Sequence, residues 1–199
     1  MQKAIKAGVF CACLVPFIYL FVQLLLNNLG PDPGDTLSIE TGEWTFRFLL
    51  ITLAVTPTQD LTGLRITNRY RRMLGLFCLF YACCHFLVYL MFLLGFRWSS
   101  LYLDILERPY ITVGFSAFLI LVALGVTSPK AMLRKLGKNW KRLHRFIYLA
   151  AALAMIHMIW ILRSDYGEAL LYGILVAVLL GYRLVKYMRK KRRLLFSSG

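Results

Sequence analysis

Residues 140–160 read WKRLHRFIYLAAALAMIHMIW, an apolar, helix-forming run nearly long enough to cross a bilayer. The run contains His144 and His157, two of the three histidines in the chain. The third, His85, lies in another apolar run, residues 73–96. Because an ionisable side chain is costly in hydrocarbon, a histidine inside a membrane segment is a candidate functional residue. The sequence therefore predicts a membrane protein with its functional site between helices.

Other apolar runs of the same kind fill most of the chain. Hydrophobic residues make up 59% of the 199 residues, above the roughly 45–50% of soluble domains. A spanning helix needs about 20 mainly apolar residues. We predict an all-α, polytopic membrane protein: one transmembrane domain over residues 1–199, built as a six-transmembrane-helix bundle. The expected helices lie near residues 7–26, 44–61, 73–96, 110–127, 143–162 and 169–186.

The net charge of +15 follows the membrane topology. If both termini are cytoplasmic, all but four of the 24 Lys and Arg residues lie inside, and Asp60 is the only inside acid. This positive-inside pattern predicts cytoplasmic termini. The basic segments are then expected to contact anionic membrane lipid. Nucleic-acid binding is not expected, because the spans leave no basic globular face to carry it.

Two of the histidines lie at matching depth. At about 1.5 Å per residue, His85 lies about 20 Å above Arg72, and His157 lies about 18 Å above Arg145. Two imidazoles at one depth on different helices can ligate one heme iron, and the small residues Ala82 and Ala154 would leave room for a flat macrocycle. The alternative is that each histidine only hydrogen-bonds a neighbouring helix. Zinc is disfavoured because no third ligand lies at that depth.

His144 and two arginines lie near the inner interface. On an ideal helix His144 lies about 140° around the axis from His157, so it is expected to serve another purpose. It could ligate a second heme with a non-histidine partner, or contact a propionate, a flavin or a quinone. Arg71 and Arg72 could bind a flavin phosphate or a heme propionate, because guanidinium groups recognise both. An anchoring role at the membrane surface is the alternative for the arginines.

Several stretches together resemble a known family. They are Thr41-Gly42, residues 52–57 (TLAVTP), residues 71–76 (RRMLGL), His85, residues 108–112 (RPYIT), and a segment from Leu136 through Trp140, His144 and Tyr148 to His157 and Trp160. In this order and spacing the chain resembles the heme-binding membrane subunits of the bacterial periplasmic protein-methionine-sulfoxide reductase system, the MsrQ family of the ferric-reductase-like transmembrane superfamily. The family's histidines correspond to His85, His144 and His157.

The resemblance implies six helices, b-type heme, FMN and a bacterial inner-membrane location. It implies that electrons enter from the quinone pool or a cytoplasmic flavin reductase. They would leave to a periplasmic molybdopterin-containing catalytic subunit that reduces methionine sulfoxide in oxidised envelope proteins. The chain would then be an electron-transfer subunit and not the catalytic one. It has no GxGxxG motif for a nicotinamide cofactor.

Two other functions are compatible with the sequence. One is a stand-alone transmembrane reductase of ferric iron or another small acceptor. The other is a non-redox small transporter in which the histidines are structural, although no broken-helix pair occurs in matching halves. Residues 27–43 form the longest expected outside loop and carry Asp32, Asp35, Glu40 and Glu43. This acidic loop is expected either to contribute to partner docking or to serve as an ordinary connector.

Overall fold

The computed structural model describes residues 2–63, 66–161 and 167–196, with side chains described for 3–63, 70–161 and 167–192. All regular structure in these parts is helical. The helices in chain order are α1 (Gln2–Leu25), α2 (Pro33–Thr62), α3 (Ile66–Val88), the π-helical turn η1 (Tyr89–Leu93), α4 (Trp98–Glu107), α5 (Pro109–Val126), α6 (Lys130–Leu136), α7 (Lys138–Leu143), the 3-10 turn η2 (His144–Phe146), α8 (Ile147–Ile161) and α9 (Gly167–Phe196).

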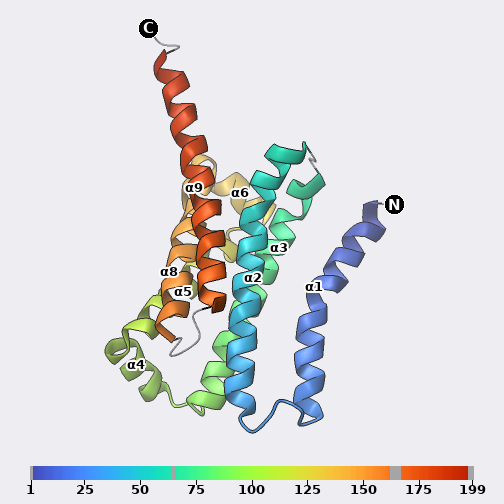
Figure 1. Ribbon diagram of the computed structural model, residues 1–199, viewed down its shortest axis with the longest axis vertical. Helices are drawn as coiled ribbons and strands as arrows, with labels where there is room; N and C mark the ends of the chain where they lie inside the picture. The colour runs from blue at the N-terminus through green and yellow to red at the C-terminus, as the bar shows by residue number, and fades with distance from the viewer. Residues whose placement is uncertain (1, 64–65, 162–166, 197–199) are drawn as a thin grey trace.

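The long helices α1, α2, α3, α5, α8 and α9 run alternately down and up, so the chain begins and ends at the same end of the bundle (Figure 1). Five segments of the described chain are long and apolar enough to cross a membrane: Lys3–Leu25, Tyr70–Leu93, Pro109–Val126, Lys138–Ile161 and Gly167–Arg192. The protein is therefore a multi-pass membrane protein. The expected sixth span, residues 44–61, lies within α2, which is not among these five.

The low hydropathy of α2 comes from its polar residues. The bundle accommodates them because they have hydrogen-bond or ion-pair partners inside it. Arg47 forms an ion pair with Glu43, and its Nε donates to the hydroxyl of Tyr172 on α9 at 2.9 Å. On the same helix, Leu49 and Leu53 are 1% and 0% exposed. A helix that faces mostly protein needs less apolar surface than one that faces lipid.

The N-terminal half of α2 lies where the sequence analysis expected an outside loop. That prediction, a loop over residues 27–43, is wrong from Pro33 onward. Asp32 caps the helix by accepting a hydrogen bond from the Asp35 backbone at 2.9 Å, and Pro33 occupies the first turn. Both features favour helix initiation, and they outweigh the turn propensity of the surrounding glycine and proline residues.

The other predicted spans agree with the helices to within a few residues at most ends. The run 110–127 corresponds to α5, and the run 73–96 corresponds to α3 with η1. The predicted end of the fifth span, Leu162, lies outside the described residues. Sequence analysis did not anticipate α4, a short helix at the end of the bundle opposite the termini (Figure 1).

The bundle core lies between α2, α3 and α8. Tyr81 on α3 is fully buried and stacks on Phe48 of α2, with ring centroids 5.1 Å apart. Its hydroxyl donates to the Cys13 carbonyl at 2.8 Å and accepts from the Phe17 backbone N–H at 3.0 Å. These are the two groups of α1 that an ideal α-helix would pair with each other. Tyr81 thus joins α1 to the core at the turn that contains Pro16. Figure 1 shows that α1 is bent, as expected of a helix with an internal proline.

Candidate functional site

His85 of α3 packs against α2. Its Nδ1 lies 2.9 Å from the Ser38 carbonyl oxygen. A Cβ atom added to Gly42 would lie 3.2 Å from two atoms of the ring, which is closer than an ordinary contact. The absent side chain at Gly42 therefore lets the imidazole approach the α2 backbone. The Ser38 carbonyl and Gly42 are four residues apart, so they lie on one face of the helix.

His157 of α8 is held in the same way by α5. Its Nδ1 lies 2.7 Å from the Tyr110 carbonyl oxygen. A Cβ atom added to Gly114 would lie only 2.5 Å from this nitrogen. Tyr110 and Gly114 are again four residues apart, and Pro109 starts the helix that carries them. The two histidines thus share one arrangement: a carbonyl and a following glycine on the neighbouring helix.

The two hydrogen bonds fix the chemistry of the rings. A carbonyl oxygen can only accept, so Nδ1 must carry the proton, and Nε2 is left with a lone pair. Neither Nε2 has a hydrogen-bond partner among the described residues. Metal-ligating histidines commonly donate their other N–H to a carbonyl in this way. Both imidazoles are therefore prepared to act as neutral Nε2 ligands.

The two rings lie close together between α3 and α8. Their centroids are 6.4 Å apart and their planes are inclined by 79°. Metal–imidazole bonds of about 2.0–2.1 Å place two opposed rings with centroids about 6–6.5 Å apart. No third His, Cys, Asp or Glu within the described parts of the chain joins them as a metal-binding group. The spacing of the two rings is therefore compatible with two axial imidazole ligands of one heme iron.

His144 lies apart from this pair, near the end of the bundle where the chain terminates. We call this end, which carries Asp60, Arg71 and Lys186, the basic end. The Nε2 of His144 lies 3.2 Å from the hydroxyl of Thr127, and the ring stacks on Trp140 with centroids 3.9 Å apart. The Trp140 indole N–H donates to the Thr127 carbonyl at 2.9 Å. Through Thr127, His144 and Trp140 thus connect the end of α5 to α7 and η2.

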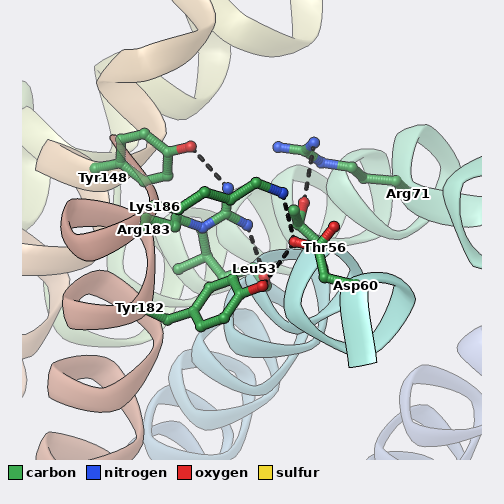
Figure 2. Close-up of polar contacts among 8 residues, drawn as sticks. All are labelled: Leu53, Thr56, Asp60, Arg71, Tyr148, Tyr182, Arg183 and Lys186. Carbon is green, nitrogen blue, oxygen red and sulfur yellow. Dashed lines mark hydrogen bonds and ion pairs between the residues drawn. The ribbon is translucent and has the colours of Figure 1, made fainter. Parts of the chain in front are cut away.

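Arg71 and Arg72 differ sharply in their surroundings. Arg71 is half-buried, contacts the Thr56 hydroxyl at 3.5 Å and interacts electrostatically with Tyr148 (Figure 2). It also lies close enough to His144 for their charges to interact. Arg72 is exposed. The interior position of Arg71 makes it the stronger candidate of the two for binding an anionic group.

Three aromatic residues close in sequence to His85 or His157 have other surroundings. Tyr81 bonds to α1, as described above. The Tyr89 hydroxyl donates to Asp104 of α4 at 2.5 Å, and Asp104 forms an ion pair with Arg108 at 3.2 Å. Trp160 is 54% exposed. The two alanines expected to make room for a macrocycle, Ala82 and Ala154, belong to the hydrophobic core, whereas glycines contact the rings.

Four residues of the site were not singled out from the sequence: Ser38, Gly42, Tyr110 and Gly114. Gly42 and Tyr110 belong to two of the matching stretches, Thr41-Gly42 and residues 108–112, which could have indicated them. Ser38 and Tyr110 contribute only backbone carbonyls. Because every residue type has this group, the sequence does not indicate that these two positions belong to the site. Gly114 lies one helical turn after Tyr110, a spacing that has meaning only once the acceptor is known.

Comparison with known proteins gives consistent matches over nearly the whole chain. The family model described as "Ferric reductase like transmembrane component" matches residues 41–155. The "Protein-methionine-sulfoxide reductase heme-binding subunit MsrQ" of Xanthomonas euvesicatoria pv. vesicatoria is 44% identical, with 95% of this chain and 89% of the relative aligned. The protein of the same name from Polaromonas naphthalenivorans is 41% identical over 97% of this chain and 90% of the relative. No solved structure shows significant similarity to the chain.

Proposed function

The chain belongs to the ferric reductase-like transmembrane family and, within it, to the MsrQ subunits, and we propose that it is a heme-binding electron-transfer subunit of a methionine sulfoxide reductase system. The observation that carries this proposal is the His85–His157 pair, with ring centroids 6.4 Å apart and both Nδ1 atoms engaged by backbone carbonyls. His85 and His157 are the proposed axial ligands of one b-type heme.

When bound, heme supplies a one-electron carrier. The chain's own residues would set its position and exclude other ligands. The carbonyls of Ser38 and Tyr110 fix the ring orientations, and such hydrogen bonds increase the basicity of the ligating nitrogen. With His85 and His157 both holding the iron, small molecules such as oxygen would have no open site. This arrangement favours electron transfer over substrate binding.

The proposed topology has six spans, with both termini cytoplasmic and α2 as the second span. The alternating directions of the long helices support an even number of crossings (Figure 1). The positive-inside rule supports a cytoplasmic location for the basic end. The proposed location of the protein is the bacterial inner membrane. Reporter fusions at the two termini and in the α4 region would test this topology.

The proposed electron route runs from the basic end to the opposite end. The donor would be the quinone pool or a cytoplasmic flavin reductase. FMN is a proposed second cofactor at the basic end, where His144 and Arg71 lie. The acceptor would be a periplasmic molybdopterin-containing catalytic subunit, which we expect to co-purify with the chain when both are produced together. Failure of the two proteins to co-purify would favour the alternative function, a stand-alone reductase of small acceptors.

The absorption spectrum of the purified protein tests the proposal. We expect a reducible heme signal that is lost in His85→Ala and in His157→Ala. As a matched control, Trp160→Phe alters an exposed residue of the same helix as His157 and should leave the signal intact. A colourless wild-type protein, or full heme in both histidine variants, would contradict the proposed ligation.

A further inference from the structure

A second polar cluster lies at the basic end, between α2, α3, α8 and α9. Figure 2 shows the Arg71 guanidinium, the Arg183 guanidinium and the Tyr148 hydroxyl directed toward one another from three different helices. Lys186 and Asp60 border the same region. Arg183 was not singled out in the sequence. In the structure it is half-buried and faces the bundle.

Both terminal nitrogens of Arg183 have hydrogen-bond acceptors, whereas its Nε has none among the described residues. One terminal nitrogen donates to the Tyr148 hydroxyl and the other to the Leu53 carbonyl, both at 2.7 Å. The guanidinium carbon lies 5.0 Å from the Tyr148 ring centroid. Its Nε is buried and has no hydrogen-bond partner among the described residues. A buried donor of a charged group without an acceptor is costly, so the Arg183 Nε would be stabilised by an acceptor.

The cluster has more positive than negative charge. Asp60 is its only carboxylate among the described side chains, and Lys186 and Tyr182 already bond it at 2.5 and 2.7 Å. Arg71 and Arg183 repel each other electrostatically, and the neutral oxygens of Thr56, Leu53 and Tyr148 are their direct partners. Asp60 attracts Arg183 electrostatically but is already paired with Lys186, so the two partly buried like charges have no carboxylate of their own, which is unfavourable. A bound anion would remove this cost.

We propose that Arg71 and Arg183 form a phosphate-binding site at the basic end of the bundle. Phosphate suits the site because guanidinium groups donate to its oxygens in a fork geometry. Tyr148 accepts a hydrogen bond from Arg183 and interacts electrostatically with Arg71. The Leu53 carbonyl fixes the orientation of Arg183. The phosphate can belong to a mononucleotide such as FMN, to the headgroup of an anionic phospholipid, or to free inorganic phosphate. The FMN case rests on the proposed function.

The decisive experiment measures binding to the heme-containing full-length protein in detergent. The probes are FMN, riboflavin, which lacks the phosphate, and inorganic phosphate against chloride at equal ionic strength. Flavin binding is read by fluorescence quenching, and phosphate binding is read by the thermal unfolding midpoint. The same midpoint in nanodiscs with and without phosphatidylglycerol tests the lipid source.

We expect Arg71→Gln and Arg183→Gln to weaken binding of the phosphate-bearing probe about tenfold to hundredfold, as loss of a charge-assisted hydrogen bond would. Arg72→Gln, a change at the exposed neighbour, should alter it less than about twofold. If FMN is the ligand, riboflavin should bind alike to all variants. If free phosphate is the ligand, inorganic phosphate should raise the thermal unfolding midpoint and phosphatidylglycerol should not. If lipid is the ligand, the reverse should hold. Either increase should require both arginines.

Three results would overturn the assignment: none of the probes binds in a way that depends on Arg71 and Arg183, Arg72→Gln causes an equal loss, or riboflavin binding falls as much as FMN binding. Arg183→Lys retains the charge without the fork and should give an intermediate affinity, which guards against a variant that fails to fold. The heme spectrum of each preparation separates the two proposals. Normal heme without phosphate binding rejects only the phosphate site, whereas absent heme in the wild-type protein rejects the proposed function.

Discussion

Replacing Gly114 with alanine should impair heme binding although position 114 contributes no ligand. The new Cβ atom would lie 2.5 Å from Nδ1, 2.6 Å from Cε1 and 2.9 Å from Cγ of His157. Non-bonded carbon atoms prefer about 3.5–4.0 Å, so the ring or its helix must move by about 1 Å. A movement of that size would stretch the 2.7 Å contact between Nδ1 and the Tyr110 carbonyl.

Loss of a hydrogen bond that orients a metal ligand typically weakens metal binding about 10–100-fold. At limiting heme we therefore expect the heme content of Gly114→Ala to fall about tenfold or more. Gly42→Ala should have a smaller effect, because its Cβ atom would lie 3.2 Å from the nearest His85 atoms. Gly181→Ala is the matched control, since a Cβ atom there meets no atom within 4 Å.

The assay is the reduced-minus-oxidised absorption difference per mole of purified protein, combined with a potentiometric titration of the heme that remains. A Gly114→Ala protein with wild-type heme content and midpoint potential would show that the close approach of His157 to α5 is unimportant. A loss of equal size in Gly181→Ala would assign the effect to helix propensity and not to contact with the ring.

Three further predictions concern other parts of the molecule. Tyr81→Phe removes both hydrogen bonds to α1 and should lower the free energy of unfolding by about 1–3 kcal/mol, measured by denaturation in detergent, with the heme spectrum retained. His144→Ala should keep the His85–His157 heme signal, since His144 lies apart from that pair; loss of all heme would contradict this separation. Neutralising Asp35 and Glu40 together should slow electron delivery to the periplasmic partner most at low ionic strength, and an unchanged rate and salt dependence in stopped-flow measurements would exclude a docking role for these acids.

The membrane fold was largely predictable because hydropathy reports lipid contact directly. The run 110–127 coincides with α5 to within one residue at each end. The prediction was poorest for α2, which faces protein and therefore carries Glu43, Arg47 and several threonines that hydropathy counts against it. The capping signal of Asp32 and Pro33 was present in the sequence, but the turn-forming residues around it led to the prediction of a loop.

The candidate site was predictable only as far as side chains define it. Counting residues at a fixed rise predicted His85 and His157 at one depth, and their ring centroids lie 6.4 Å apart. The acceptors of their Nδ1 protons could not be predicted, because a backbone carbonyl is common to every residue type. Arg183 could not be singled out, because the sequence does not show which face of α9 turns toward Tyr148.

The pairing of each imidazole with a main-chain oxygen has a consequence for mutational tolerance. Positions 38 and 110 can take other side chains without altering the tautomer of His85 or His157. The acceptor is a backbone carbonyl, which remains after every substitution that preserves the helix. Positions 42 and 114 have no such freedom, since any larger residue would occupy the space of the ring. A saturation library should therefore show two permissive positions, each followed one helical turn later by an intolerant one.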